Sequence, residues 1–242
     1  MKLLKLILLT ICAFPFVGSA QINLVRNPSL EQYARCPNIT DGIKYANFWS
    51  SISDTIFSAT DSLGDGFCTP EYCNTCCISG SISVPNSATY YHYPRTGNGM
   101  AQVQMYYTEV DTAEHYKRDY LQGRLKSVLI PGKQYGVSFY VTLEQVSAYA
   151  IDHIGAFLDD GTIDTTTNCG HPQTTHIPQV HSTGIINDTL NWVKIEGTFT
   201  ATGIEKFITI GNFFDLAHTD TLRVHFPLGT LMHNDKLTWY LR

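Results

Sequence analysis

Apolar and polar residues alternate along several segments of the chain, and this pattern predicts β-strands. In residues 135–143 the apolar side chains of Val137, Phe139 and Val141 occupy every second position and should face a core. Further strands are predicted at residues 45–50, 101–107, 120–129, 151–158, 192–200 and 207–214. Turn residues separate them, and only residues 112–120 have a pattern suited to one or two helical turns.

Many short strands without alternating helices favour a β-sandwich over a sheet built from β-α-β units. The composition agrees, because aromatic residues make up 12% of the chain and charged residues only 15%. The length suits one large β domain. We therefore predict an all-β sandwich over residues 21–242.

The first 20 residues have the order of a secretory signal peptide. Lys2 and Lys5 precede the apolar run 6–17, and the small residues 18–20 follow it. That run is shorter than the about 20 residues that a membrane-spanning helix needs. We expect cleavage before Gln21 and a mature protein in the periplasm, at the cell surface or outside the cell.

Charge argues against a nucleic-acid partner, and hydropathy argues against a membrane span. The net charge of −5 gives no electrostatic basis for nucleic-acid binding. No later apolar run is long enough to span a membrane, so we expect no transmembrane segment.

Six cysteines remain after signal removal: Cys36, Cys68, Cys73, Cys76, Cys77 and Cys169. An even number in an exported chain indicates disulfides. Four of them crowd residues 68–77, within the irregular region 51–95, at a spacing that could instead hold zinc. We expect a long loop stapled by disulfides. The pairing stays open, although Cys36 and Cys169 each need a partner from the cluster or from each other.

A second metal candidate combines Cys169 with three histidines, His171, His176 and His181. Thiolate and imidazole are the usual zinc ligands, but this spacing matches no zinc signature. A polar loop with incidental histidines is the simpler interpretation.

Catalysis would need a carboxylate pair or a nucleophile with its base. The acidic candidates are Glu109, Asp111, Glu144 and Asp152. Asp152 stands out because it interrupts an apolar strand, where a buried carboxylate needs partners, and a structural hydrogen-bonding role is the alternative. The chain has no nucleophile elbow, phosphate loop or dinucleotide fingerprint. We therefore assign no catalytic residue and do not expect an enzyme.

Motifs spread over nearly the whole mature chain resemble a secreted module of Bacteroidetes. They lie at residues 23–31, 69–72, 94–98, 120–121, 137–141, 149–156, 192–199 and 210–213. Such modules commonly stand ahead of an OmpA-like peptidoglycan-binding domain or a type IX secretion sorting domain. The resemblance implies a role in the bacterial cell envelope.

More distantly, Asn-Pro-Ser-Leu-Glu at residues 27–31 and Gly-Thr-Phe-Thr-Ala at residues 197–201 resemble carbohydrate-binding modules with a galactose-binding-like fold. This resemblance implies a jelly-roll sandwich and a structural calcium held by Glu31 and Asp235. The alternative is that Glu31 accepts hydrogen bonds from turn amides and Asp235 is exposed. Lys236 stands where the pattern has an apolar residue.

Aromatic rings, on which sugars stack, gather in and near the irregular region. They are Trp49, Tyr72, Tyr90, Tyr91, Tyr93, Tyr106, Tyr107 and Tyr116. From these and the polar residues that could bind hydroxyls, we predict a ligand site of Trp49, Tyr72, Tyr91, Arg95, Tyr106 and Asn212. The alternative for each ring is that it covers the edge of the core.

We expect a noncatalytic binding or adhesion module whose partner is glycan or peptidoglycan. A structural envelope protein that engages a protein partner is one alternative. A glycan hydrolase is the other.

Overall fold

The computed structural model describes residues 22–38, 42–52, 69–78, 80, 82–86, 91–107, 118–163, 173–224 and 236–241, the last range as backbone only. In chain order the strands are β1 (Trp49–Ser51), β2 (Glu71–Asn74), β3 (Gly99–Tyr107), β4 (Leu121–Arg124), β5 (Gln134–Leu143), β6 (Tyr149–Ile151), β7 (Ile154–Asp159), β8 (Val180–His181), β9 (Val193–Thr200), β10 (Phe207–Asn212), β11 (Thr221–Arg223) and β12 (Lys236–Leu241). Two short 3-10 helices, η1 (Gly42–Tyr45) and η2 (Leu216–His218), complete the described elements. Across those ranges, no helix has the length and apolar character needed to cross a membrane.

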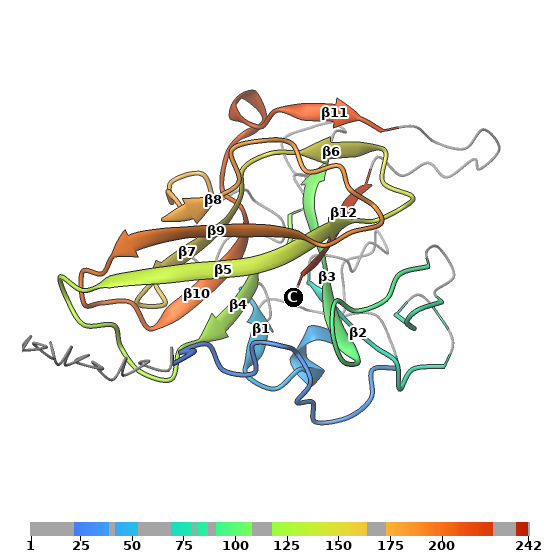
Figure 1. The fold of residues 1–242 in the computed structure, drawn as a ribbon, viewed down its shortest axis with the longest axis horizontal. Coiled ribbons are helices and arrows are strands. Elements are labelled where there is room, and N and C mark those ends of the chain that lie inside the picture. Colours follow the sequence, from blue (N-terminus) through green and yellow to red (C-terminus); the bar gives the residue numbers. More distant parts are fainter. Residues whose placement is uncertain are drawn as a thin grey trace, which may run out of the picture.

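The strands form two five-stranded antiparallel sheets and a two-stranded ribbon. One sheet has the order β1-β4-β10-β7-β8, the other has the order β2-β3-β12-β5-β9, and the ribbon pairs β11 with β6. In Figure 1 the long strands β5 and β9 cross in front of β7 and β10, so the two sheets lie in separate layers. The predicted all-β sandwich is confirmed.

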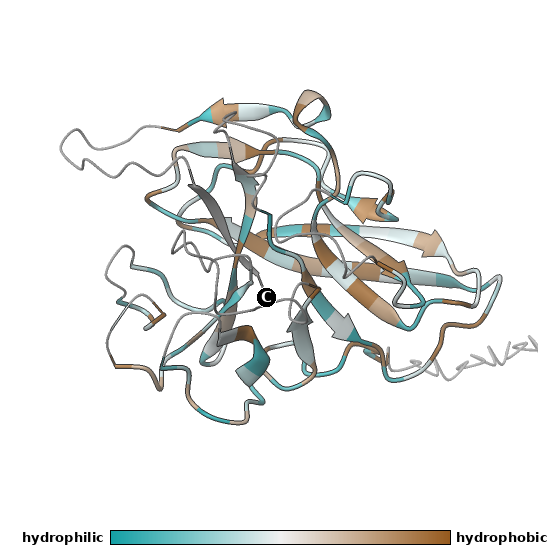
Figure 2. Ribbon diagram, turned by 180° about the vertical axis from the view of Figure 1, so that it is seen from behind, coloured by the Kyte–Doolittle hydropathy of each residue, from teal (hydrophilic) through white to brown (hydrophobic). Residues whose placement is uncertain are grey.

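The main core lies between the two sheets. Val137, Phe139 and Val141 of β5 are buried, as the alternating pattern predicts. Ile208 and Ile210 of β10 belong to the same cluster. Figure 2 shows hydrophobic residues recurring along the strands at the centre of the molecule. Burial of these alternating faces is what holds the sheets together.

The predicted strand over residues 151–158 is interrupted. β6 ends at Ile151 and β7 begins at Ile154, because His153 has a φ angle of 55°. That angle lies in the left-handed region, which a regular strand does not use. The Asp152–His153 step therefore turns the chain from the ribbon into the first sheet.

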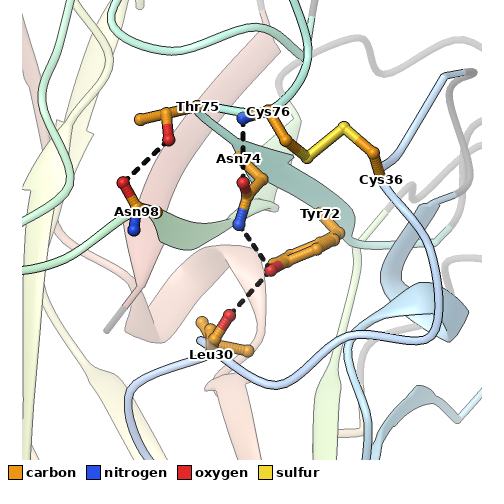
Figure 3. The surroundings of a disulfide bond; sticks show 7 residues. All are labelled: Leu30, Cys36, Tyr72, Asn74, Thr75, Cys76 and Asn98. Atoms are coloured by element: carbon orange, nitrogen blue, oxygen red, sulfur yellow. Dashed lines mark hydrogen bonds between the residues drawn. A yellow bond between two sulfur atoms is a disulfide. The ribbon is translucent and has the colours of Figure 1, made fainter.

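A disulfide between Cys36 and Cys76 fastens the irregular region to the N-terminal segment, as Figure 3 shows. Beside it, the Tyr72 hydroxyl donates to the carbonyl oxygen of Leu30 at 2.8 Å. The hydroxyl also accepts from Asn74 Nδ2 at 2.7 Å, and Asn74 Oδ1 accepts from the Cys76 amide at 3.0 Å. The bridge confirms a stapled loop and gives Cys36 a partner from the cluster.

The other cysteines differ in their surroundings. Cys73 of β2 packs with Ile82, Val84 and Met100 in a small cluster, and Cys77 lies against it. Cys68 and Cys169 lie outside the described residues.

Candidate functional site

Four of the six predicted ligand-site residues are buried: Trp49, Tyr72, Tyr106 and Asn212. The Trp49 indole donates to the carbonyl oxygen of Asn27 at 2.9 Å. Asn212 Oδ1 accepts from the Phe214 amide at 2.9 Å. Burial raises the pKa of the Tyr72 phenol well above its usual value. These side chains serve the interior and do not belong to the exposed surface that a ligand could contact.

The other two, Tyr91 and Arg95, lie on one surface segment, in which residues 92–94 have no regular secondary structure and Arg95 begins a bend. Along residues 91–95 exposure alternates: Tyr91, Tyr93 and Arg95 are exposed, whereas His92 and Pro94 are buried. In an extended chain, side chains two positions apart share a face and are spaced by about 6.5–7 Å. We call the exposed row Tyr91, Tyr93 and Arg95 the platform.

The two tyrosines of the platform form a rigid pair. Their ring centroids are 5.6 Å apart with an interplanar angle of 88°, and their hydroxyl oxygens are 3.1 Å apart. The hydrogen bond to Tyr93 raises the pKa of Tyr91. Tyr91 is 51% exposed and Tyr93 is 59% exposed. Edge-to-face packing fixes the rings while ring surface and hydroxyls stay in solvent.

His92 and Trp192 support the platform from below. The His92 ring lies 5.4 Å from the Trp192 ring, centroid to centroid. The Trp192 indole donates to the carbonyl oxygen of Tyr93 at 3.3 Å. Burial lowers the pKa of His92, and the charge of Asp188 opposes that shift. Trp192 also packs on the small cluster over β2 and β3, so the platform lies over the outer face of the second sheet.

Two hydrogen bonds to backbone groups hold the start of the platform segment. The His92 amide donates to the carbonyl oxygen of Pro85 at 2.9 Å. Gln145 Nε2 donates to the carbonyl oxygen of Tyr91 at 3.1 Å. The segment is thus tied to neighbours on two sides before any ligand binds.

Asp188 fixes the turn that places Trp192. Its carboxylate accepts from the amides of Leu190 at 2.8 Å and Asn191 at 2.7 Å, and these bonds lower its pKa. Its carbonyl oxygen accepts from the Leu143 amide at the end of β5 at 2.9 Å. The turn is therefore attached directly to the sheet.

Arg95 ends the platform against the sheet. Its guanidinium carbon lies 3.6 Å from the centroid of the Tyr140 ring. Tyr140 of β5 pairs with Lys194 of β9, and Lys194 Nζ forms an ion pair with Glu196 at 2.5 Å. The stack holds Arg95 by its face.

Glu31 fixes the turn that follows the platform. Its two carboxylate oxygens accept from the Asn98 amide at 3.0 and 3.1 Å, and Oε1 also accepts from the Gly99 amide at 3.2 Å. This is the turn-amide role given above as the alternative to calcium. Asp235, the other predicted calcium ligand, lies outside the described residues.

The residues weighed as zinc candidates are not assembled into a site by the part of the chain that the structure describes. No group of three or more histidine, cysteine, aspartate or glutamate residues within that part is arranged to hold a metal ion. His181 stacks on His153, with ring centroids 5.2 Å apart, whereas His176 packs against Phe157. His171, like Cys169, lies outside the described residues.

The acidic candidates for catalysis have structural contacts. Asp152 is buried, its Oδ1 accepts from the Asp220 amide at 2.9 Å, and its Oδ2 lies 2.6 Å from His153 Nδ1. Glu144 Oε1 accepts from Gln102 Nε2 at 3.5 Å. Asp152 thus has the hydrogen-bonding role that was its alternative interpretation. Glu109 and Asp111 lie outside the described residues.

Tyr93, Tyr140 and Trp192 belong to the site but are absent from the predicted set. For Tyr93 the sequence held a usable signal, because Tyr91, Tyr93 and Arg95 stand at every second position of Tyr-His-Tyr-Pro-Arg. Tyr140 lies on β5 and Trp192 immediately precedes β9, and the pairing of these two strands brings both residues to the platform.

No protein-family model and no curated protein matches the chain. Among solved structures, the CBM22-1 xylan-binding domain from Paenibacillus barcinonensis Xyn10C is 16% identical, over 62% of this chain and 71% of that one, with a TM-score of 0.34. A cyclase from Fischerella sp. TAU is 14% identical over 90% of this chain and 95% of that one, with a TM-score of 0.43. The K1 cleaved adhesin domain of Lys-gingipain from Porphyromonas gingivalis W83 is 15% identical over 80% of this chain and 92% of that one, with a TM-score of 0.33. The similar structures thus include carbohydrate-binding and adhesin domains beside a cyclase, and likeness at this level does not decide among these functions.

Proposed function

We propose that this protein is an exported, noncatalytic binding module of the bacterial envelope, and that the platform holds a glycan or peptidoglycan strand. The observation that supports this most is the exposed Tyr91–Tyr93 pair. Exposed aromatic faces lose little conformational entropy on binding because the scaffold already fixes them. Neighbouring hydroxyls, Gln145 and Arg95 supply the polar groups that sugar hydroxyls need.

The test is binding of the purified mature protein to a glycan array and to peptidoglycan sacculi. We expect Tyr91→Ala and Tyr93→Ala each to weaken binding about tenfold or more, since one buried aromatic contact contributes about 1.5–3 kcal/mol. The matched control is Phe48→Ala. Phe48 is 49% exposed and also lies beneath an arginine, Arg26, but it adjoins β1 of the other sheet. Equal loss in the Phe48 and tyrosine variants would contradict the assignment of the site.

A protein ligand is the second candidate, because tyrosine, tryptophan and arginine also dominate protein–protein hot spots. In that case the tyrosine variants lose an envelope partner in pull-down experiments, and the wild type binds neither glycans nor sacculi. Sugar release from a polysaccharide that Asp152→Asn abolishes would instead indicate the hydrolase.

The calcium ion remains a proposal that depends on Asp235. The residue type of Glu31 suits the ion, because carboxylate oxygens are ligands that calcium prefers. A melting temperature that falls on chelation and recovers with added calcium would support the ion. An unchanged melting temperature would remove it.

A further inference from the structure

Arg95 differs from the other cations beside the platform in its electrostatic environment. Lys194 of β9, which interacts electrostatically with Arg95, is compensated by Glu196 at 2.5 Å. Arg95 makes no hydrogen bond or ion pair within the described ranges, and its contact is the face of Tyr140. Within the described residues, Arg95 is therefore a platform cation that no carboxylate pairs with.

The stack also determines how Arg95 can bind a ligand. A guanidinium has five N–H donors in its plane and none on its face. Because the face lies on Tyr140, the donors at its edge stay available to solvent. Such a planar fork matches a carboxylate, which it binds through two parallel charge-assisted hydrogen bonds.

The alternating exposure places this fork at the end of the row that begins with the two tyrosines. Tyr91, Tyr93 and Arg95 are the exposed alternate positions of one segment. A strand bound along the row would cover two aromatic rings and then reach the guanidinium. We infer that the platform selects glycans bearing carboxylate groups, such as uronic acids, with Arg95 as the residue that recognises the carboxylate.

The inference rests on the proposed function and names its ligand class. A preference for acidic glycans would be specific to this site, because the protein as a whole has a net charge of −5 and repels polyanions. Nonspecific attraction does not explain a preference for acidic glycans here. Salt should weaken the binding as for one ion pair rather than for an extended basic patch.

The experiment measures binding of the protein to polygalacturonate and to its methyl ester, which has the same sugar rings but masked carboxylates. A glycan array that pairs each acidic glycan with a neutral counterpart extends the comparison. We expect the wild type to favour the acidic forms about tenfold or more, as a charge-assisted pair permits. Arg95→Ala should abolish the preference, and Arg95→Lys should keep part of it. Arg26→Ala, which removes the matched arginine over Phe48, should keep all of it.

The outcomes separate this inference from the proposed function. Tyrosine-dependent binding with no acidic preference, or a preference that survives Arg95→Ala, overturns the inference and leaves glycan binding intact. A stronger response to sulfated than to carboxylated glycans overturns the carboxylate assignment. Absence of binding to every glycan and to sacculi overturns both proposals.

Discussion

His92 makes the stability of the platform segment depend on pH. The ring is buried beside Trp192, and burial lowers its pKa from the usual 6.5. The unfolded chain therefore takes up a proton near pH 6.5, whereas the folded protein does so only at lower pH. The stability that neutral His92 contributes is complete above pH 6.5 and is lost as the pH falls through the folded pKa.

We expect the free energy of unfolding of the wild type to decrease between pH 7.5 and pH 5.5 by more than that of His92→Phe. Urea unfolding at several pH values measures this difference. Asp159, whose pKa burial raises, acts in the opposite direction, but it is present in both proteins and cancels in the comparison. Parallel curves for wild type and His92→Phe would contradict the role of His92.

Residue type alone did not separate the exposed aromatic residues of the platform from the aromatic residues of the core. Tyr72 and Tyr91 are both tyrosines of the irregular region, yet Tyr72 is fully buried and Tyr91 is half exposed. The difference comes from strand pairing: Tyr72 lies opposite Ala101 on the core face of the second sheet, whereas the Tyr91 segment crosses the outside. Such long-range pairing is not encoded in the local pattern.

Among the elements, the segment around β2 depends most on a covalent constraint. Its fastening to the N-terminal segment includes the Cys36–Cys76 bridge, which spans 40 residues of sequence. Closing a loop of this length removes conformational entropy from the unfolded chain, which stabilises the fold by about 4 kcal/mol.

We expect Cys36→Ser/Cys76→Ser to lower the free energy of unfolding by about that 4 kcal/mol. Reductant should reproduce most of the loss in the wild type. The control is the double variant itself, which reductant should change little. A large further loss there would show that other bridges carry the stabilisation, and an unchanged midpoint in the double variant would contradict the prediction for Cys36–Cys76. Platform binding measured on both proteins shows whether the staple also orders residues 91–95.

Regular strands were predictable where one face alone is buried. β5 follows its alternating pattern, with Val137, Phe139 and Val141 inward. The break between β6 and β7 was not predictable, because an apolar run does not reveal the positive φ angle of His153. Two contacts of Asp152, to the Asp220 amide and to His153, accompany that turn. Since they arise from packing between the ribbon and the sheet, periodicity does not contain them.

For the whole molecule, the last described strand is the one that completes the second sheet. β12 lies between β3 and β5, with both neighbours antiparallel, so the chain end occupies the middle of the sheet, as Figure 1 shows. Its partners come from residues more than 90 positions earlier in the sequence. Until β12 inserts, β3 and β5 have unpaired edges facing each other, and core formation has to wait for a highly nonlocal contact.

A proline in β12 should therefore abolish folding, whereas a proline in the peripheral ribbon should not. Tyr240 pairs with Gln102 of β3 and with Thr142 of β5, so Tyr240→Pro removes a backbone donor at the centre of the ladder. Leu222→Pro in β11 disturbs only the pairing with β6. We expect the β12 variant to lose its cooperative melting transition and to aggregate, and the β11 variant to melt cooperatively at a lower temperature. Circular dichroism and size-exclusion chromatography distinguish the two. A cooperative transition in Tyr240→Pro would mean that the sandwich forms without β12, and the two sheets would then have to be stabilised chiefly by their local hairpins.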